Sequence, residues 1–406
     1  MTENAILAKY YREDLYPVEL IYRMMSCDKK DQSAEARVIG VQYKGSNLFV
    51  AYEYKRDSLQ SLRHKMFFAS SSFPQSMHMA HFKESGGNKL VRLKKELVFD
   101  MDVTDFTRYC ACHDVKRLCP ACWPQLQGAS LILQHIVENH LGYEQRHCLW
   151  VFSGRRGLHC FINDPCAMSL SDTERQQLYK RLSIATGDDA RLIAFITSLS
   201  RREPEFLASI EKFFLDSVLR EQDLLNTTTT DAKRETLEAF CLRHLRQRHQ
   251  ALYHLVKSAW DKLTVSQSPT KKTRLDMTPS DNLSMRKWKA LLSLESLAVS
   301  PYKASAFICV RFFYPVIDKG PLRLTHQIKL PFSVHASTLN VALPLSQEDI
   351  MQMNIMTDTL KVDVLCKEKK QPPVFVEGVR LLQEWVEMYT EFIEETEEEE
   401  GSAMMM

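Results

Sequence analysis

The segment ELVFDMDV, residues 96–103, constrains the fold most strongly. Its three consecutive apolar residues require burial, and their β-branched and aromatic character favours a strand. Because side chains alternate across a strand, Asp100 and Asp102 project from one face, whereas the neighbouring phenylalanine and methionine project from the other. Buried carboxylates are costly unless they are compensated. The chain must therefore fold so that cations or donors reach this strand.

Two carboxylates on one rigid strand face form half of a site for Mg²⁺ or Mn²⁺, hard cations that prefer oxygen ligands. Nucleotidyl transfer uses two such ions to activate the attacking hydroxyl and to stabilise the leaving pyrophosphate. The pair is a weak signal alone, since 51 acidic residues among 406 give about six acidic-x-acidic pairs by chance. The alternative is a solvent-facing edge strand, and the apolar residues before Asp100 argue against it.

A cysteine-rich segment, CACHDVKRLCPAC, follows this strand. Cys119 and Cys122 form the tight pair typical of one half of a zinc site. Cys110, Cys112 and His113 are three candidates for the other two ligands. Four such ligands fit tetrahedral Zn²⁺, and a zinc without an open position would be structural. The alternatives are a redox pair or unligated thiols. We expect this knuckle to brace a loop beside the two carboxylates.

A glycine–arginine turn, SGRRGLH, follows the predicted strand HCLWVF. Backbone N–H groups and guanidinium forks at such a turn suit a triphosphate, whose oxygens accept charge-assisted hydrogen bonds. The spacing of a Walker A loop is absent. The alternative is a basic surface turn. The residues that this turn brings together are Ser153, Arg155, Arg156 and His159.

A second basic cluster lies in HQIKLPFSVH, which begins at His326. Lys329 and His335 flank an apolar stretch, and Asp318 precedes the segment. A lone histidine is more often a satisfied core residue than a ligand, but two histidines and a lysine near an acid are harder to dismiss. We predict that Lys329 and His335 contact nucleotide phosphates and that Asp318 is the third carboxylate of the metal site.

The order of predicted elements indicates an α/β (α+β) fold with mixed β-sheets. A strand, a helix and a second strand follow one another between 96 and 152, and a hairpin is predicted at 38–54. Helical spacing dominates from about 170 to 298, and 304–318 and 332–345 return to strand character. The chemistry-bearing residues lie on both sides of the helical stretch. This predicts an inserted helical subdomain.

The expected domains follow from this pattern. Residues 1–169 hold the first part of a catalytic α/β domain with the zinc knuckle at 110–122, residues 170–298 the helical insertion, residues 299–385 the second part of the catalytic domain, and residues 386–406 an acidic, disordered tail.

The overall composition is that of a globular protein whose net charge produces no strong electrostatic field. Apolar residues make up 45% and charged residues 26%, and the formal net charge is +2. Any basic surface is therefore local. The first residues lack a secretory apolar region, and no apolar run approaches ~18 residues. We expect an intracellular chain with no membrane contact and with reduced cysteines.

The four motifs, in this order, resemble the small catalytic subunit of archaeo-eukaryotic DNA primases of the eukaryotic type. The resemblance runs from about Tyr10 to Pro344, with the helical stretch only weakly similar. It implies a primase catalytic domain that carries a helical subdomain and a zinc knuckle. The implied roles are metal binding and catalysis for Asp100, Asp102 and Asp318, triphosphate contacts for Ser153, Arg155, Arg156, His159, His326, Lys329 and His335, and zinc binding for Cys112, His113, Cys119 and Cys122, with Cys110 as a rival ligand.

The implied function is synthesis of short RNA primers on single-stranded DNA from ribonucleoside triphosphates. The implied cofactors are two catalytic Mg²⁺ or Mn²⁺ ions and one structural Zn²⁺. An iron–sulfur large subunit and DNA polymerase alpha are the implied partners, and the nucleus is the implied location. The alternatives are a stand-alone primase-polymerase and a zinc-braced nucleic-acid-binding subunit without catalysis.

The sequence departs from the family at three places. The paired cysteines at the start of the knuckle correspond to Cys112 and His113, which implies a change of ligand from cysteine to histidine. The first strand of the hairpin has Arg37-Val38 where the family has Arg-Glu, so one acid that contacts the nucleotide is absent or shifted. The spacing between Asp318 and His326 is one residue shorter.

Overall fold

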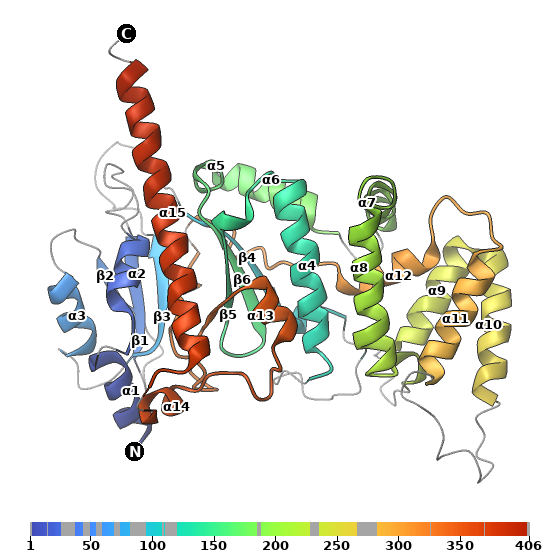
Figure 1. The fold of residues 1–406 in the computed structure, drawn as a ribbon, viewed down its shortest axis with the longest axis horizontal. Coiled ribbons are helices and arrows are strands. Elements are labelled where there is room, and N and C mark those ends of the chain that lie inside the picture. The colour runs from blue at the N-terminus through green and yellow to red at the C-terminus, as the bar shows by residue number, and fades with distance from the viewer. Residues whose placement is uncertain are drawn as a thin grey trace. The chain divides into compact units, whose positions relative to one another are not determined.

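The computed structural model describes most of the chain. The described residues are 2–13, 15–25, 37–43, 49–53, 59–68, 74–81, 95–107, 109, 120–184, 188–227, 235–265, 282–324, 326–368 and 370–403. Figure 1 shows the helices and strands that they form.

The chain contains both helices and strands, which confirms an α+β protein. They are α1 (Glu3–Arg12), α2 (Val18–Met25), β1 (Arg37–Tyr43), β2 (Phe49–Glu53), α3 (Leu59–Phe67), β3 (Pro74–His81), β4 (Leu97–Asp102), η2 (Val103–Asp105), α4 (Trp123–Asn139), η3 (Gln145–His147), β5 (Cys148–Phe152), β6 (Gly157–Ile162), α5 (Pro165–Met168), α6 (Asp172–Leu182), α7 (Asp189–Arg202), α8 (Pro204–Phe214), η4 (Leu215–Arg220), η5 (Leu224–Asn226), α9 (Leu237–Arg248), α10 (Gln250–Val265), α11 (Leu283–Glu295), α12 (Ala304–Phe313), β7 (Ile328–Lys329), β8 (Pro344–Leu345), α13 (Gln347–Gln352), α14 (Val362–Lys367) and α15 (Pro373–Ala403).

The chain divides into two compact units. The first unit contains Met1–Asp102, Leu133–Leu182 and Val316–Met406, and the second contains Val103–Ile132 and Ser183–Pro315. The residue boundaries of the second unit therefore differ from those of the predicted insertion at 170–298. Helix α6 stays with the first unit because its Arg175 side chain bonds to the backbone before β4. Helix α12 joins the second unit because it packs against α7 and α8.

The first unit is built on two four-stranded sheets, in the orders β2-β1-β3-β7 and β4-β6-β5-β8. The predicted hairpin is confirmed, since β1 and β2 pair antiparallel from Val38↔Glu53 to Gln42↔Phe49. The expectation of mixed sheets is wrong for the described strands, because all of their pairings are antiparallel. Strands β4 and β5 run in the same direction, as the intervening helix requires, but β6 turns back and lies between them.

The segment after the second unit connects the two sheets of the first unit. Its strand β7 pairs with β3 at the edge of one sheet, through His78↔Lys329. Its strand β8 pairs with β5 at the edge of the other, through Trp150↔Leu345. The segment from β7 to β8 therefore places Lys329 on one sheet and then joins the other sheet, which contains the carboxylate strand β4.

The second unit is helical around an aromatic core. Phe214, at the end of α8, contacts Trp288 at a ring-centroid distance of 5.2 Å and Phe312 at 5.4 Å. The strand predicted over 304–318 is wrong, because Ala304–Phe313 forms helix α12. Nine of its ten residues are buried, so the segment is apolar on every face, and such a run does not distinguish a buried strand from a buried helix.

Helix α15 extends from Pro373 to Ala403 and so runs into the acidic region at 386–406. Its first half buries an apolar stripe that includes Phe375, Leu382 and Trp385, and proline is favoured at the first position of a helix. The glutamates that follow are good helix formers, so the helix continues into them.

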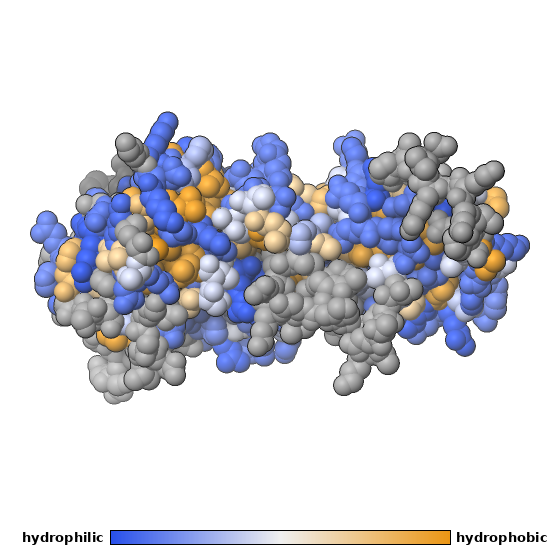
Figure 2. Space-filling view, turned by 90° about the horizontal axis from the view of Figure 1, so that it is seen from below, coloured by the Kyte–Doolittle hydropathy of each residue, from blue (hydrophilic) through white to orange (hydrophobic). Residues whose placement is uncertain are grey.

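The surface of the described residues in Figure 2 is mostly hydrophilic, with apolar side chains between the polar ones. Among the described helices, none combines the length and the apolar character that a membrane crossing requires.

Candidate active site

The three predicted carboxylates lie on neighbouring backbone. On β4, Phe99 and Met101 are buried, whereas Asp100 and Asp102 are partly exposed on the other face, as predicted. The backbone N–H of Asp318 donates to the carbonyl oxygen of Asp100 at 2.9 Å. Asp318 is thereby held along the open edge of β4, and the acid far along the chain joins the pair.

The environment of Asp100 is short of positive charge. The pKa of Asp100 is raised to about 7, first by burial and then by the neighbouring Asp318 and Asp102, against the lowering effects of Lys329 and His326. All four side chains are therefore close enough to Asp100 to act on its charge. A crowded acid that resists ionisation is the arrangement that a divalent cation relieves. The donor set therefore fits a hard metal ion.

Two predicted phosphate-binding residues instead contact the carboxylates. Arg156 Nε donates to Asp102 Oδ2 at 2.7 Å, so one acid is neutralised by the turn itself. His159 Nε2 lies 3.5 Å from Asp100 Oδ1. This second contact is not an ion pair at neutral pH, because burial and then Lys329 lower the pKa of His159 to about 3. Since β6 pairs His159 directly with Asp100, both side chains share one face of the sheet.

Lys329 connects the carboxylates to the glycine–arginine turn. Its Nζ atom donates to the carbonyl oxygen of Ser153 at 3.0 Å. Burial lowers the pKa of Lys329 to about 8, with Asp100 raising it and Arg155 lowering it. The buried ammonium thus lies between an acid and the turn, where a phosphate could share it.

The turn at Ser153–Gly157 is held by its own backbone and by the segment after Lys329. Ser153 N–H donates to the Gly157 carbonyl at 2.9 Å, and Thr338 Oγ1 donates to the Gly154 carbonyl at 2.7 Å. Gly154 has a φ of +84°, and an added Cβ there would lie 2.9 Å from the Cβ of His335. Only glycine satisfies both the backbone conformation and the close approach.

His335 is oriented to donate a hydrogen bond. The backbone N–H of Ser337 donates to its Nδ1 atom at 3.2 Å, so the proton of the neutral ring is on Nε2. Positive φ angles of 62° at Phe332 and 59° at Leu339 bracket this histidine. Such strained conformations persist where the surrounding structure imposes them and often occur at functional sites.

A family model covers the region that contains this site. The DNA primase small subunit family matches residues 99–346, which contain every acid and base described above. The chain belongs to the DNA primase small subunit family.

Relatives of this primase family cover most of the same region. The DNA primase small subunit of Schizosaccharomyces pombe is 31% identical over 274 residues, 64% of this chain and 54% of that protein. The subunit of Saccharomyces cerevisiae is 28% identical over 277 residues, 64% of this chain and 60% of that protein. An archaeal primase small subunit from Pyrococcus abyssi is 30% identical over 97 residues, 24% of this chain and 27% of that protein. The chain thus spans little more than half the length of the first of these relatives.

The primase zinc knuckle lies almost entirely outside the described residues. Cys110, Cys112, His113 and Cys119 are not described, and Cys122 is a buried residue just before α4. The zinc-ligand assignment and the choice between Cys110 and His113 therefore stay predictions.

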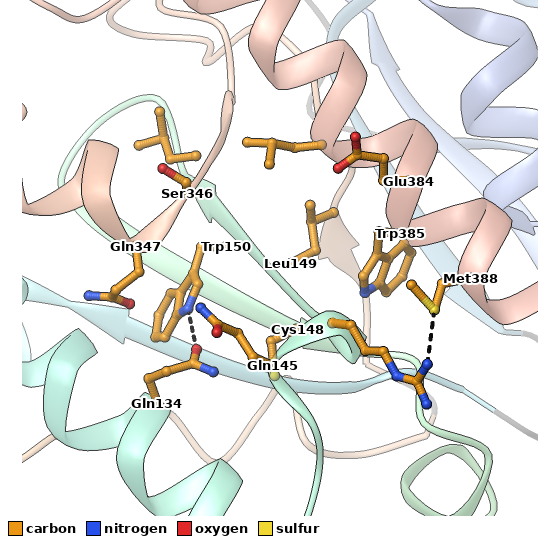
Figure 3. A pocket seen from close by; sticks show the side chains of 13 residues that line it. Gln134, Gln145, Cys148, Leu149, Trp150, Ser346, Gln347, Glu384, Trp385 and Met388 are labelled. Carbon is orange, nitrogen blue, oxygen red and sulfur yellow. Dashed lines mark hydrogen bonds between the residues drawn. The ribbon is translucent and has the colours of Figure 1, made fainter.

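A cavity of about 210 Å³ lies elsewhere in the first unit of this chain (Figure 3). Trp150 and Trp385 line it together with residues of α13 and α15, and Trp150 Nε1 donates to Gln134 Oε1 at 2.7 Å. Trp150 pairs with the residue next to His159 on β6, so it projects from the sheet face opposite to Asp100. No predicted site residue lines this cavity.

Several residues that hold the primase site were not predicted. Tyr10 Oη donates to the Phe332 carbonyl at 2.8 Å, and Tyr11 Oη accepts from the Val334 N–H at 3.3 Å. Both tyrosines lie at the start of the region that resembles the family, and nothing in their local sequence pattern indicates this role. Thr338 carried no sequence signal, since a threonine in a loop is common.

Replacing Thr338 by Val is expected to loosen the glycine–arginine turn without disturbing the carboxylates. One hydrogen bond of about 1 kcal/mol is lost, so we expect the KM for ATP to rise about fivefold and kcat to change little. Steady-state primer synthesis measures both. Thr197→Val is the matched control, because Thr197 Oγ1 makes an equivalent 2.7 Å bond to Ile193 within α7 of the second unit. An unchanged KM in the Thr338 variant would contradict the role of this bond.

Proposed function

We propose that this chain is the catalytic small subunit of a DNA primase, a DNA-directed RNA polymerase that joins ribonucleotides into short primers on single-stranded DNA. One observation carries the proposal: Asp318 is bonded to the backbone of Asp100, and Asp102 is paired with Arg156 of the turn. Lys329 and His326 lie close enough to act on the charge of Asp100. Carboxylates for metal ions opposite cations for a triphosphate are the requirements of nucleotidyl transfer.

The position of each residue in the site gives it a different role in the reaction. Asp100, Asp102 and Asp318 would hold two Mg²⁺ or Mn²⁺ ions, which supply charge neutralisation and activation of the primer hydroxyl when bound. The ion pair with Arg156 uses only Asp102 Oδ2, so the other carboxylate oxygen can still face a metal ion. The remaining N–H donors of the guanidinium can reach phosphate oxygens, so Arg156 would link the metal site to the nucleotide site.

The basic residues orient the triphosphate. Lys329 supplies a buried positive charge beside Ser153, and His335 presents Nε2–H as a donor. Arg155 and His326 add positive charge nearby, since Arg155 acts on Lys329 and His326 acts on Asp100. Fixed donors in a water-poor environment stabilise developing charge without reorganisation during the reaction.

Binding partners and a cellular location are also part of the proposed function. The relatives are named as small subunits, which supports a complex with a primase large subunit and a DNA template. An iron–sulfur cluster in that subunit, an association with DNA polymerase alpha and a nuclear location complete the proposal, and they rest on the family resemblance.

Primer synthesis on poly-dT with ATP and Mn²⁺ tests this function. The chain, alone or with a primase large subunit, is expected to produce short oligoadenylate products. The parallel reaction with dATP distinguishes a primase from a stand-alone primase-polymerase, which would extend with deoxynucleotides. If neither nucleotide is incorporated although the protein binds single-stranded DNA, the non-catalytic binding subunit is the better description.

One zinc ion per chain is expected by elemental analysis of the purified protein. A Cys119→Ser variant should lose this zinc and unfold at a lower temperature, because structural zinc contributes folding free energy directly. Metal analysis should also separate the two candidate ligands, since only the true one reduces the zinc content when Cys110 or His113 is replaced. A zinc-free wild type of full stability would refute the assignment.

A further inference from the structure

The loop between Asp318 and His326 is held by a completely buried lysine. Lys95, which directly precedes β4, is 0% exposed. Its Nζ atom donates to the carbonyl oxygens of Pro321 at 3.2 Å, Arg323 at 2.9 Å and His326 at 2.9 Å. A buried ammonium that uses its three donors on one loop is a specific arrangement, since lysine is almost never fully buried without partners.

Two charged residues of α6 hold the same loop. The guanidinium of Arg175, 1% exposed, donates to the Glu96 carbonyl at 3.2 Å and to the Leu322 carbonyl at 3.5 Å. Asp172 Oδ1 accepts from the backbone N–H of Leu324 at 2.9 Å. The loop is therefore bonded to the structure at the start of β4, and it is fixed relative to the strand that carries the carboxylates.

This loop places an acid and a base of the site relative to each other. At its start, the Gly320 N–H donates to Asp318 Oδ1 at 2.9 Å. At its end, the ring of His326 lies over Gly320, where an added Cβ would be 2.9 Å from the ring. Because the Lys95 ammonium bonds to the carbonyl of His326 itself, a shift of the loop would move the metal-binding end and the nucleotide-binding end together.

We propose that Lys95 is a positioning residue that sets the placement of Asp318 and His326, and through them the affinity for the catalytic cation and the nucleotide. This inference rests on the proposed function. The short distance from Asp318 to His326 along the chain leaves the loop little room to adjust by itself. Removing the ammonium takes one hydrogen bond from each of the three carbonyls, of which that of Arg323 keeps a bond from the His326 N–H at 3.2 Å.

Lys95→Met tests the proposal, since it keeps the length of the side chain and removes the donors. We expect the dissociation constant for Mn²⁺, measured by electron paramagnetic resonance, and the KM for ATP each to rise about tenfold or more, the effect typical of residues that orient metal ligands. Lys287→Met is the matched control. Lys287 is 1% exposed and its Nζ donates to the Leu225 carbonyl at 3.1 Å and to Glu238 Oε2 at 2.9 Å, all within the second unit.

The control separates positioning from stability. Both variants should unfold at lower temperature, but only Lys95→Met should bind Mn²⁺ and ATP more weakly. Wild-type Mn²⁺ affinity and wild-type KM in a folded Lys95→Met protein would overturn the proposal. Equal weakening in Lys287→Met would do the same, because the effect would then follow from stability alone.

Gly320→Ala provides a second variant if Lys95→Met does not fold. The added methyl group would displace the ring of His326 while Lys95 stays bonded, so we expect at least a fivefold rise in the KM for ATP. An unchanged KM would show that the conformation of this loop does not control binding. If wild-type protein binds Mn²⁺ and ATP but makes no primers, the proposed function fails, whereas the binding measurements still decide the role of Lys95.

Discussion

An Asp100→Asn variant is expected to make no detectable primers and yet to unfold at a higher temperature than the wild type at pH 8. The loss of synthesis follows from removing a metal ligand at the centre of the site. Metal-bridged charge stabilisation is worth several kcal/mol, so the rate should fall about a thousandfold or more.

The gain in stability follows from the raised pKa of Asp100. Burial raises this pKa from 3.8 to about 7, with Asp318 and Asp102 adding to the effect. The folded protein therefore binds the proton more tightly than the unfolded chain. Its stability falls as the pH rises from about 4 to about 7, and at pH 8 the folded state carries the full cost of the ionised carboxylate. Asparagine has no charge to bury, so the gain should be largest at pH 8 and should fade toward pH 4.

Asp102→Asn is the control for this pair of effects. It should also abolish synthesis, but it breaks the ion pair with Arg156 and should not raise the unfolding temperature. Thermal unfolding without metal at several pH values, together with primer synthesis, makes the comparison. An active Asp100→Asn enzyme, or one less stable than the wild type at pH 8, would contradict the site that is described here.

A Lys329→Met variant is expected to lose about a hundredfold in kcat/KM for ATP. Lys329 is the buried cation that faces Asp100 and donates to the Ser153 carbonyl, and removing one preorganised donor to a developing charge typically costs about 10²–10³ in rate. Methionine keeps much of the volume, so the folded structure should survive. Initial rates over a range of ATP concentrations measure the loss.

The pH dependence of the same reaction gives a second measurement. Because burial lowers the pKa of Lys329 to about 8, the ammonium loses its proton as the pH rises past this value, and kcat/KM of the wild type should decrease above about pH 8. Lys329→Arg should keep its rate at higher pH, since a guanidinium stays protonated. The Lys329→Met variant should lack this alkaline decrease. If it shows the decrease of the wild type, another group controls the alkaline limb.

Local pattern in the sequence was sufficient for much of the candidate site. Strand alternation in ELVFDMDV correctly separated Asp100 and Asp102 from the buried Phe99 and Met101, because a two-residue period leaves no other arrangement once the strand is buried. Helical spacing likewise predicted α8, in which Ile210 and Phe214 are buried. The family resemblance identified Asp318 and the basic residues as one site.

The tertiary structure decided every feature that depends on contacts between segments far apart in the sequence. The apolar run of α12 was compatible with a strand or a helix, and its packing against α7 and α8 in the folded unit selects the helix. The pairing of Arg156 with Asp102, the insertion of β6 between β4 and β5 and the reach of Lys95 to the loop before His326 have no local pattern. A local period in the sequence indicates which face of an element is buried. The partner that neutralises a buried charge or accepts its hydrogen bond comes from a distant part of the chain. That partner is therefore fixed only when the whole unit packs.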